Sequence, residues 1–114
     1  MEMSTLDAAF AALSDPTRRA ILSRLATGEA TVMELAEPFA MSQPAISRHL
    51  KVLEGAGLIT RRVEGAKRPC RLAPQAIKEI DRWLDWLRKA MEANYDRLDA
   101  VLAELEQNEG KEDQ

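Results

Sequence analysis

The segment from residue 42 to residue 53 carries side chains that could contact a nucleic acid. At 100° per residue, Ile46, Leu50 and Leu53 share one face of a predicted helix and point inward. The outward face and its flanks carry Gln43, Pro44, Ser47, Arg48, His49 and Lys51. Gln, Ser and Arg suit the base edges of the major groove, whereas Lys and protonated His suit phosphates. An ordinary solvated surface helix is the alternative for this segment taken alone.

A basic hairpin is predicted next. Residues 58–63 favour a strand, residues 64–67 a turn, and residues 68–72 a returning strand that Pro69 confines to an edge or makes irregular. The cations of this hairpin are Arg61, Arg62, Lys67, Arg68 and Arg71. A helix-turn-helix followed by a cationic hairpin is the winged-helix arrangement, in which the helix reads bases and the wing holds the DNA backbone or a minor groove. A charged strand edge that prevents aggregation is the alternative, and the two can hold together.

Charge is unevenly distributed along the chain. The net charge is −3 overall, but residues 42–71 hold seven Lys or Arg against two Glu, which makes that segment +5. Residues 1–41 sum to −3 and residues 72–114 to −5. Because phosphate repels carboxylates, we expect the C-terminal part to face away from DNA.

Capping signals predict the helices that position the reading segment. A first helix is expected over about residues 3–13, and a second starts with Asp15 as N-cap and Pro16 at the first helical position. We expect its buried side to comprise Ala20, Ile21, Leu22 and Leu25. Thr31 and Glu34 form a capping box at the third helix, and Ser42 caps the fourth. The third and fourth helices form the helix-turn-helix. The hydroxyls or nearby amides of Thr31 and Ser42 could also meet phosphates.

One long helix is predicted from residue 74 to about residue 107, followed by a polar, frayed tail over residues 108–114. Its apolar residues alternate steps of three and four, with Asn94 as the single polar member of this seam. Such a helix spans about 50 Å, more than a chain of this size can cover alone. We therefore expect a homodimer, assisted by the first helix. The predicted interface comprises Leu6, Phe10, Ile80, Trp83, Leu84, Leu87, Met91, Asn94, Leu98 and Val101.

Composition limits the other classes of function. A length of 114 residues suits one domain, here residues 1–107, and no apolar run is long enough to span a membrane. The N-terminus lacks the features of a signal peptide, and a single cysteine fits a reducing cytoplasm. We see no Ser/His/Asp set, phosphate loop or metal cluster, so we expect neither an enzyme nor a cofactor. A protein-interaction adaptor acting through the long helix is the alternative to a DNA-binding regulator.

The chain resembles bacterial ArsR-type winged helix-turn-helix repressors. The resemblance rests on residues 13–22 (LSDPTRRAIL), residues 42–53 (SQPAISRHLKVL) and residues 57–59 (GLI). It implies a mainly α fold with a small β-hairpin wing and a homodimer on a palindromic DNA operator. It also implies repression, including repression of the chain's own gene, by occupancy.

Metal-sensing members carry a cysteine pair in the third helix, or Asp and His ligands along the last helix. Here residues 31–37 hold neither Cys nor His, and the only histidine, His49, lies in the reading segment. The resemblance is thus to the subgroup without metal sites, and any small-molecule effector is unknown. Cys70 lies in the wing, where Arg68 and Arg71 could lower its pKa. A thiol-responsive role stands beside the simpler interpretation of Cys70 as an apolar filler.

Overall fold

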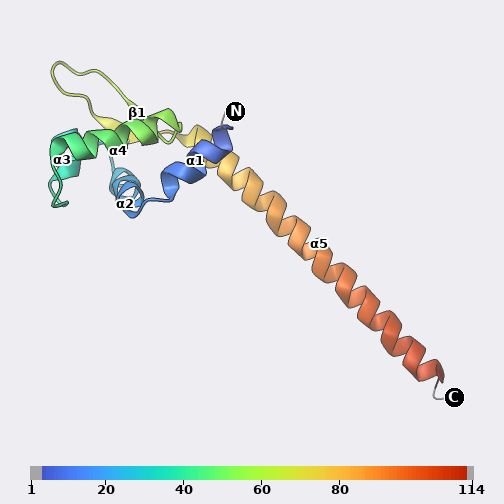
Figure 1. Cartoon of the computed structure of the whole chain (residues 1–114). Coiled ribbons are helices and arrows are strands. Elements are labelled where there is room, and N and C mark those ends of the chain that lie inside the picture. The colour runs from blue at the N-terminus through green and yellow to red at the C-terminus, as the bar shows by residue number, and fades with distance from the viewer. Residues whose placement is uncertain (1–3, 113–114) are drawn as a thin grey trace. The chain divides into compact units, whose positions relative to one another are not determined.

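The computed structural model describes residues 4–112, with side chains described as far as residue 108. The chain divides after Ile80 into two compact units. The first unit holds α1 (Thr5–Leu13), α2 (Pro16–Leu25), α3 (Val32–Ala36), α4 (Gln43–Gly55), β1 (Ile59–Arg61), β2 (Cys70–Leu72) and the start of α5 (Pro74–Glu112) (Figure 1). The expected single domain over residues 1–107 is therefore a folded unit that ends at Ile80 and a helix that continues beyond it.

The helix starts follow the predicted capping signals. Asp15 caps α2 by accepting a hydrogen bond from the Arg18 amide, with Pro16 in the first turn. Thr31 and Glu34 form a complete capping box at α3. Ser42 caps α4 by accepting from the Ala45 amide. Because each cap needs only residues three apart in the chain, sequence spacing was enough to locate these helix starts.

Helix α4 lies at the centre of the first unit. It contacts α1, α2, α3 and β1. The inward face predicted from its spacing is confirmed, since Ile46, Leu50 and Leu53 are fully buried. The remaining fully buried large side chains are contributed by other elements: Ile21, Leu35, Leu58, Ile59 and Cys70. Ala20 was expected to belong to the buried side of α2, but it is exposed, because the face of α2 that packs inward is centred on Ile21 and Leu25.

The wing is a two-stranded antiparallel hairpin. Ile59 pairs with Leu72, Thr60 with Arg71 and Arg61 with Cys70. Glu64 and Lys67 exchange two backbone hydrogen bonds of 2.9 and 3.0 Å across a turn in which Gly65 has a φ of +61°. Pro69 lies outside the ladder, as its missing N–H predicted, and its carbonyl accepts from the Arg62 amide. Backbone bonds of 3.2 and 2.8 Å also join Cys70 to Ala30, just before α3.

The second unit is the continuation of α5 from Asp81 onward. The helix reaches Glu112, beyond its expected end at about residue 107, and the frayed tail expected over residues 108–114 stays a prediction; residues 113–114 lie outside the described residues. Glu and Lys are good helix formers, and extending an existing helix avoids the cost of nucleation. The first helix begins at Thr5, with Ser4 as its N-cap, rather than at residue 3.

Candidate nucleic-acid interface

The outward face of α4 presents polar and cationic side chains. Gln43, Arg48 and Lys51 are exposed, and Ser47 is half-buried beside them. The Arg48 Nε donates to the Pro44 carbonyl at 3.4 Å, one turn back along the same helix. This face combines bidentate hydrogen-bonding groups with a cation on a helix narrow enough for a major groove. The buried opposite face holds the helix against the rest of the unit.

His49 does not lie on this exposed face but against Asp15 and Arg18 at the start of α2. Its side chain is only 20% exposed, and its Nδ1 lies 3.3 Å from the Arg18 Nη1 and 3.9 Å from the Asp15 Oδ2. The prediction that His49 meets a phosphate is therefore not supported by its position. On a helical wheel His49 falls at the flank, and the flank that it occupies is covered by the start of α2.

Arg18 is a residue whose role sequence reasoning missed. Its Nε donates to the Ala12 carbonyl at 2.7 Å and its Nη2 to the Ala11 carbonyl at 3.2 Å, so the guanidinium closes the C-terminal end of α1. Its Nη1 faces His49 on α4. One side chain thus joins α1, α2 and α4. The signal in the sequence was the pair Arg18 and Arg19 in the first turn of α2. One cation would be enough to satisfy the end of α1, so the second indicated a further contact.

The hydroxyls of Ser42 and Thr31, both predicted to contact phosphates, differ in whether their protons are free to donate. The Ser42 Oγ is exposed and accepts from the Ala45 amide at 3.3 Å, which leaves its own proton free to donate. The Thr31 Oγ1 donates to the Glu34 Oε1 at 3.0 Å and accepts from the Glu34 amide. These hydrogen bonds from Thr31, backbone first, lower the pKa of Glu34. Thr31 therefore has its proton engaged and a carboxylate beside it, which disfavours a phosphate contact.

The five cations of the wing are not equivalent. Arg62 is neutralised by Glu29 at 2.9 Å and Glu64 at 3.2 Å. Arg61 turns inward, where its side chain is 17% exposed and its Nε lies 3.9 Å from the Glu54 Oε2. Arg71 is exposed and donates across the strands to the Thr60 Oγ1 at 3.3 Å. Lys67 and Arg68 are exposed near the tip. The wing thus offers Lys67, Arg68 and Arg71 to an approaching backbone more readily than Arg61 or Arg62.

Cys70 is fully buried at the base of the wing. Burial raises the pKa of its thiol above the usual value, although the nearby Arg61 opposes this and Glu54 adds to it. The expectation that Arg68 and Arg71 lower this pKa is wrong, because desolvation outweighs the surrounding charge. Its position matches the interpretation as an apolar filler.

The predicted dimer residues, all apolar except Asn94, differ in exposure. Leu6, Ile80 and Leu87 are half-buried. The exposed members of the set are Phe10, Trp83, Leu84, Met91, Asn94, Leu98 and Val101. Along α5, the exposed Leu105 continues the seam, and Trp86, Tyr95 and Leu102 widen the exposed apolar surface.

The described part of the chain shows neither a metal-binding cluster nor a membrane-spanning helix. Among the side chains described, those of residues 4–108, no three His, Cys, Asp or Glu gather in a way that could hold a metal ion. None of the described helices combines the length and the hydropathy needed to cross a lipid bilayer.

A helix-turn-helix with an exposed polar reading face, followed by a cationic hairpin, defines a winged helix-turn-helix protein. Residues 15–61 match the family described as "Bacterial regulatory protein, arsR family". The HTH-type transcriptional regulator Rv2034 of Mycobacterium tuberculosis is 45% identical over 84 residues, which cover 72% of this chain and 78% of that protein. The transcriptional repressor SdpR of Bacillus subtilis is 46% identical over 56 residues, covering 49% of this chain and 62% of that protein.

Solved structures agree with this match. The crystal structure of the ArsR family transcriptional regulator RHA00566 has a TM-score of 0.73 and 38% identity, covering 81% of this chain and 97% of that one. The homodimeric winged helix-turn-helix DNA-binding domain Mb0332 of Mycobacterium bovis has a TM-score of 0.59 and 26% identity, covering 77% and 79%. The chain belongs to the arsR family of bacterial regulatory proteins.

Proposed function

We propose that this chain is a dimeric transcriptional repressor that binds a pseudo-palindromic DNA operator in the cytoplasm. The observation that carries the proposal is the division of α4 into a fully buried apolar face and an exposed face bearing Gln43, Arg48 and Lys51. The family to which the chain belongs supports it, since the similar proteins include a named repressor and a homodimeric DNA-binding domain.

The proposed division of labour follows from residue chemistry and exposure. Gln43, Ser47 and Arg48 read base edges, because amide, hydroxyl and guanidinium groups match the donors and acceptors of the major groove. Lys51, Lys67, Arg68, Arg71 and the Ser42 hydroxyl hold phosphates. These contacts fix the register of the protein on the duplex, and the α4 contacts supply the sequence preference.

The proposed dimer uses the apolar seam of α5 together with Leu6 and Phe10 of α1. The 39 residues of α5 extend over about 58 Å at 1.5 Å per residue. Exposed apolar side chains at steps of three and four along that length are typical of a helix that packs on another helix. A two-fold dimer then presents its two α4 helices to half-sites ~34–36 Å apart, or a multiple of that spacing.

Selection from a random duplex library at near-physiological salt tests the operator proposal. We expect enrichment of an inverted repeat, with an affinity that falls steeply as salt rises, by about 0.9 in the logarithmic slope for each phosphate neutralised. Weak binding without sequence preference, combined with recovery of a different protein on α5, would instead support the adaptor alternative.

We also propose that this member senses no thiophilic metal. Supporting this, residues 31–37 hold no thiol or imidazole, and the one cysteine is buried. Tight Zn²⁺ or thiophilic metal sites need several N or S ligands. Adding Zn²⁺ or arsenite should leave the operator affinity of the purified dimer unchanged, whereas release of DNA at stoichiometric metal would contradict the proposal.

A further inference from the structure

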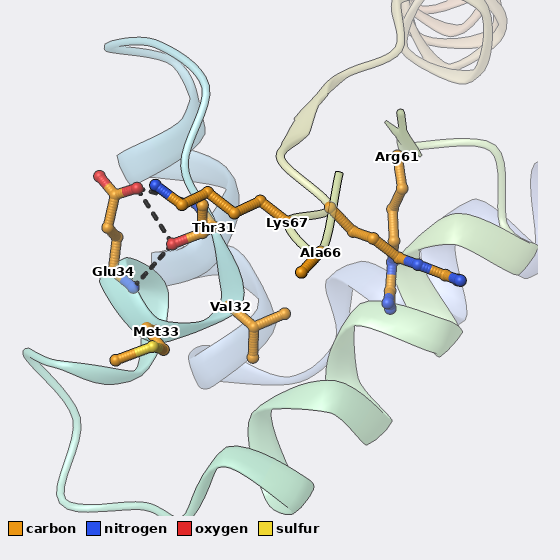
Figure 2. Close-up of a pocket in the computed structure, with 8 residues that line it drawn as sticks. Thr31, Val32, Met33, Glu34, Arg61, Ala66 and Lys67 are labelled. Atoms are coloured by element: carbon orange, nitrogen blue, oxygen red, sulfur yellow. Dashed lines mark hydrogen bonds between the residues drawn. The ribbon is translucent and has the colours of Figure 1, made fainter. Parts of the chain in front are cut away.

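A pocket of about 470 Å³ lies between the start of α3 and the wing. Figure 2 shows Val32 and Met33 of α3 on one side and Ala66 and Arg61 of the wing hairpin on the other. All its lining residues belong to the first unit. Its volume falls within the ~300–1,000 Å³ that small-molecule sites occupy. None of the proposed base-reading residues lines it.

The charge of the pocket favours an anion. Arg61, Lys67 and Arg68 line it, against the single carboxylate of Glu34. That carboxylate is already held by Thr31, whose amide and hydroxyl donate to the Glu34 Oε1 at 3.3 and 3.0 Å (Figure 2). The lining thus holds three cations against one carboxylate, and Arg61 also faces the Glu54 Oε2, outside the lining, at 3.9 Å. A guest carboxylate would reduce this excess of positive charge.

Arg61 has hydrogen-bonding capacity left over. Its Nε and Nη2 are buried and have no hydrogen-bond partner among the described residues. The Glu54 Oε2 lies 3.9 Å from the Nε, beyond hydrogen-bond range. Buried donors without acceptors are unfavourable, and a planar guanidinium pairs best with a carboxylate. Because both nitrogens are closed to solvent, a carboxylate supplies the missing acceptors once the Arg61 side chain turns toward the pocket.

The rest of the lining is apolar. Val32 and Met33 provide one wall and Ala66 the other, and the Met33 side chain is 68% exposed although it is a large hydrophobe. An apolar body lying against these residues would remove their surface from water. The combination of an apolar wall with an excess of cations favours an amphipathic anion over a bare ion.

We infer that this pocket binds a small amphipathic carboxylate, aromatic or short-chain aliphatic. The carboxylate meets Arg61, and the apolar body lies against Val32, Met33 and Ala66. Because Lys67 and Arg68 are also proposed phosphate contacts, an occupant reduces the affinity of the wing for DNA. This last step rests on the proposed function, whereas binding in the pocket does not.

Binding is tested on the full-length chain without DNA, by following backbone amide resonances during titration with benzoate. We expect saturable shifts of Val32, Met33 and Ala66 with half-saturation at ~1–10 mM, as expected of so small a probe. Benzamide, which has the same shape without the charge, should bind roughly tenfold more weakly because it forms no charge-assisted hydrogen bond. The same titration with octanoate extends the test to aliphatic carboxylates.

A matched pair of variants locates the site. Ala66→Trp fills the pocket and should remove the benzoate shifts, whereas Val63→Trp places the same side chain on an exposed part of the hairpin outside the lining and should leave them intact. Both positions are exposed, so neither change disturbs the core.

Three results would overturn the inference: no saturable shift, shifts that persist in Ala66→Trp, or equal affinity for benzoate and inorganic phosphate, which would mean that charge alone is recognised. Operator binding is measured separately and without ligand, so a failure of the repressor proposal is distinguishable from a failure of the pocket. If both hold, benzoate should weaken operator binding by wild type and not by Ala66→Trp.

Discussion

The Arg18 Nη1 and the His49 Nδ1 lie 3.3 Å apart although 31 residues separate them in the chain. If Arg18 donates, the Nδ1 accepts and His49 carries its proton on Nε2. The same guanidinium closes α1 through the Ala11 and Ala12 carbonyls. Arg18 thereby ties the helix proposed to assist dimerisation to the helix proposed to read DNA.

Arg18→Ala should lower the free energy of unfolding by about 1–3 kcal/mol, since it removes three contacts of the guanidinium and takes from the part-buried Ala12 carbonyl the donor at 2.7 Å. Urea denaturation measures the loss. Arg19→Ala is the matched control, because the neighbouring arginine donates a single exposed hydrogen bond to the Leu13 carbonyl. Equal losses from the two variants would contradict the special role of Arg18.

Arg48→Ala should remove sequence preference, because Arg48 is proposed to contact base edges. We expect operator binding to weaken by about 1–3 kcal/mol while binding to random DNA changes little. Arg68→Ala should weaken both DNAs alike and lower the salt slope by about 1, as expected of a phosphate contact. Fluorescence anisotropy over a salt series checks both. Equal losses on operator and random DNA from Arg48→Ala would remove Arg48 from the base-reading set.

Leu87→Asp should yield monomers and abolish operator binding, because it places a carboxylate in the proposed apolar seam of α5. Sedimentation velocity gives the oligomeric state. Ala93→Asp adds the same charge at an exposed position of α5 outside the seam and should remain dimeric. A Leu87→Asp protein that still sediments as a dimer would show that the interface lies elsewhere.

Lowering the pH should remove the contribution of the Asp15 carboxylate to the free energy of unfolding. The amide of Arg18, above all, donates to this carboxylate and lowers the pKa of Asp15 below its ordinary 3.8. The unfolded chain therefore binds the proton first, so the contribution is complete above pH 3.8 and is lost as the pH falls through the lower, folded pKa. Unfolding of wild type and Asp15→Ala, compared from pH 6 down to pH 2, should show a difference that narrows with acid. A constant difference would contradict this.

Cys70 should be unreactive in the folded protein, because its thiol is buried and burial raises its pKa. Iodoacetamide at pH 8 should modify it only in denaturant. Cys70→Ala should retain operator binding within about twofold, which would argue against a thiol switch because no cysteine then remains. Loss of binding on oxidation of wild type but not of Cys70→Ala would revive the redox alternative.

The features predictable from sequence were those set by neighbours along the chain. The caps at Asp15, Thr31 and Ser42, the buried stripe of α4 and the turn at Gly65 each depend on residues only a few positions apart. The spacing of a helix also identifies which residues share a face. It gave the outward positions of Gln43, Arg48 and Lys51 correctly.

The features that sequence missed depend on what packs against a face. His49 was expected to contact a phosphate because protonated His suits one, yet Asp15 and Arg18 lie against its side chain. Arg62 was counted as a free cation, yet Glu29, 33 residues away, neutralises it. Periodicity predicts the direction of a side chain on its own helix or strand. It does not predict which residues, distant in the sequence, the fold brings next to that side chain.

The backbone bridge between Ala30 and Cys70 has a consequence for the kind of DNA that this protein accepts. It joins the base of the wing, through two backbone hydrogen bonds, to the residue that leads into α3. Because α3 packs on α4, a movement of the wing base relative to these helices would break those bonds. If the distance between the wing and α4 is fixed in this way, the DNA duplex must deform to contact both. We therefore expect operator affinity to depend partly on the free energy needed to bend the base pairs between the two contacts or to narrow a groove there. This sequence preference requires no side chain in contact with those base pairs.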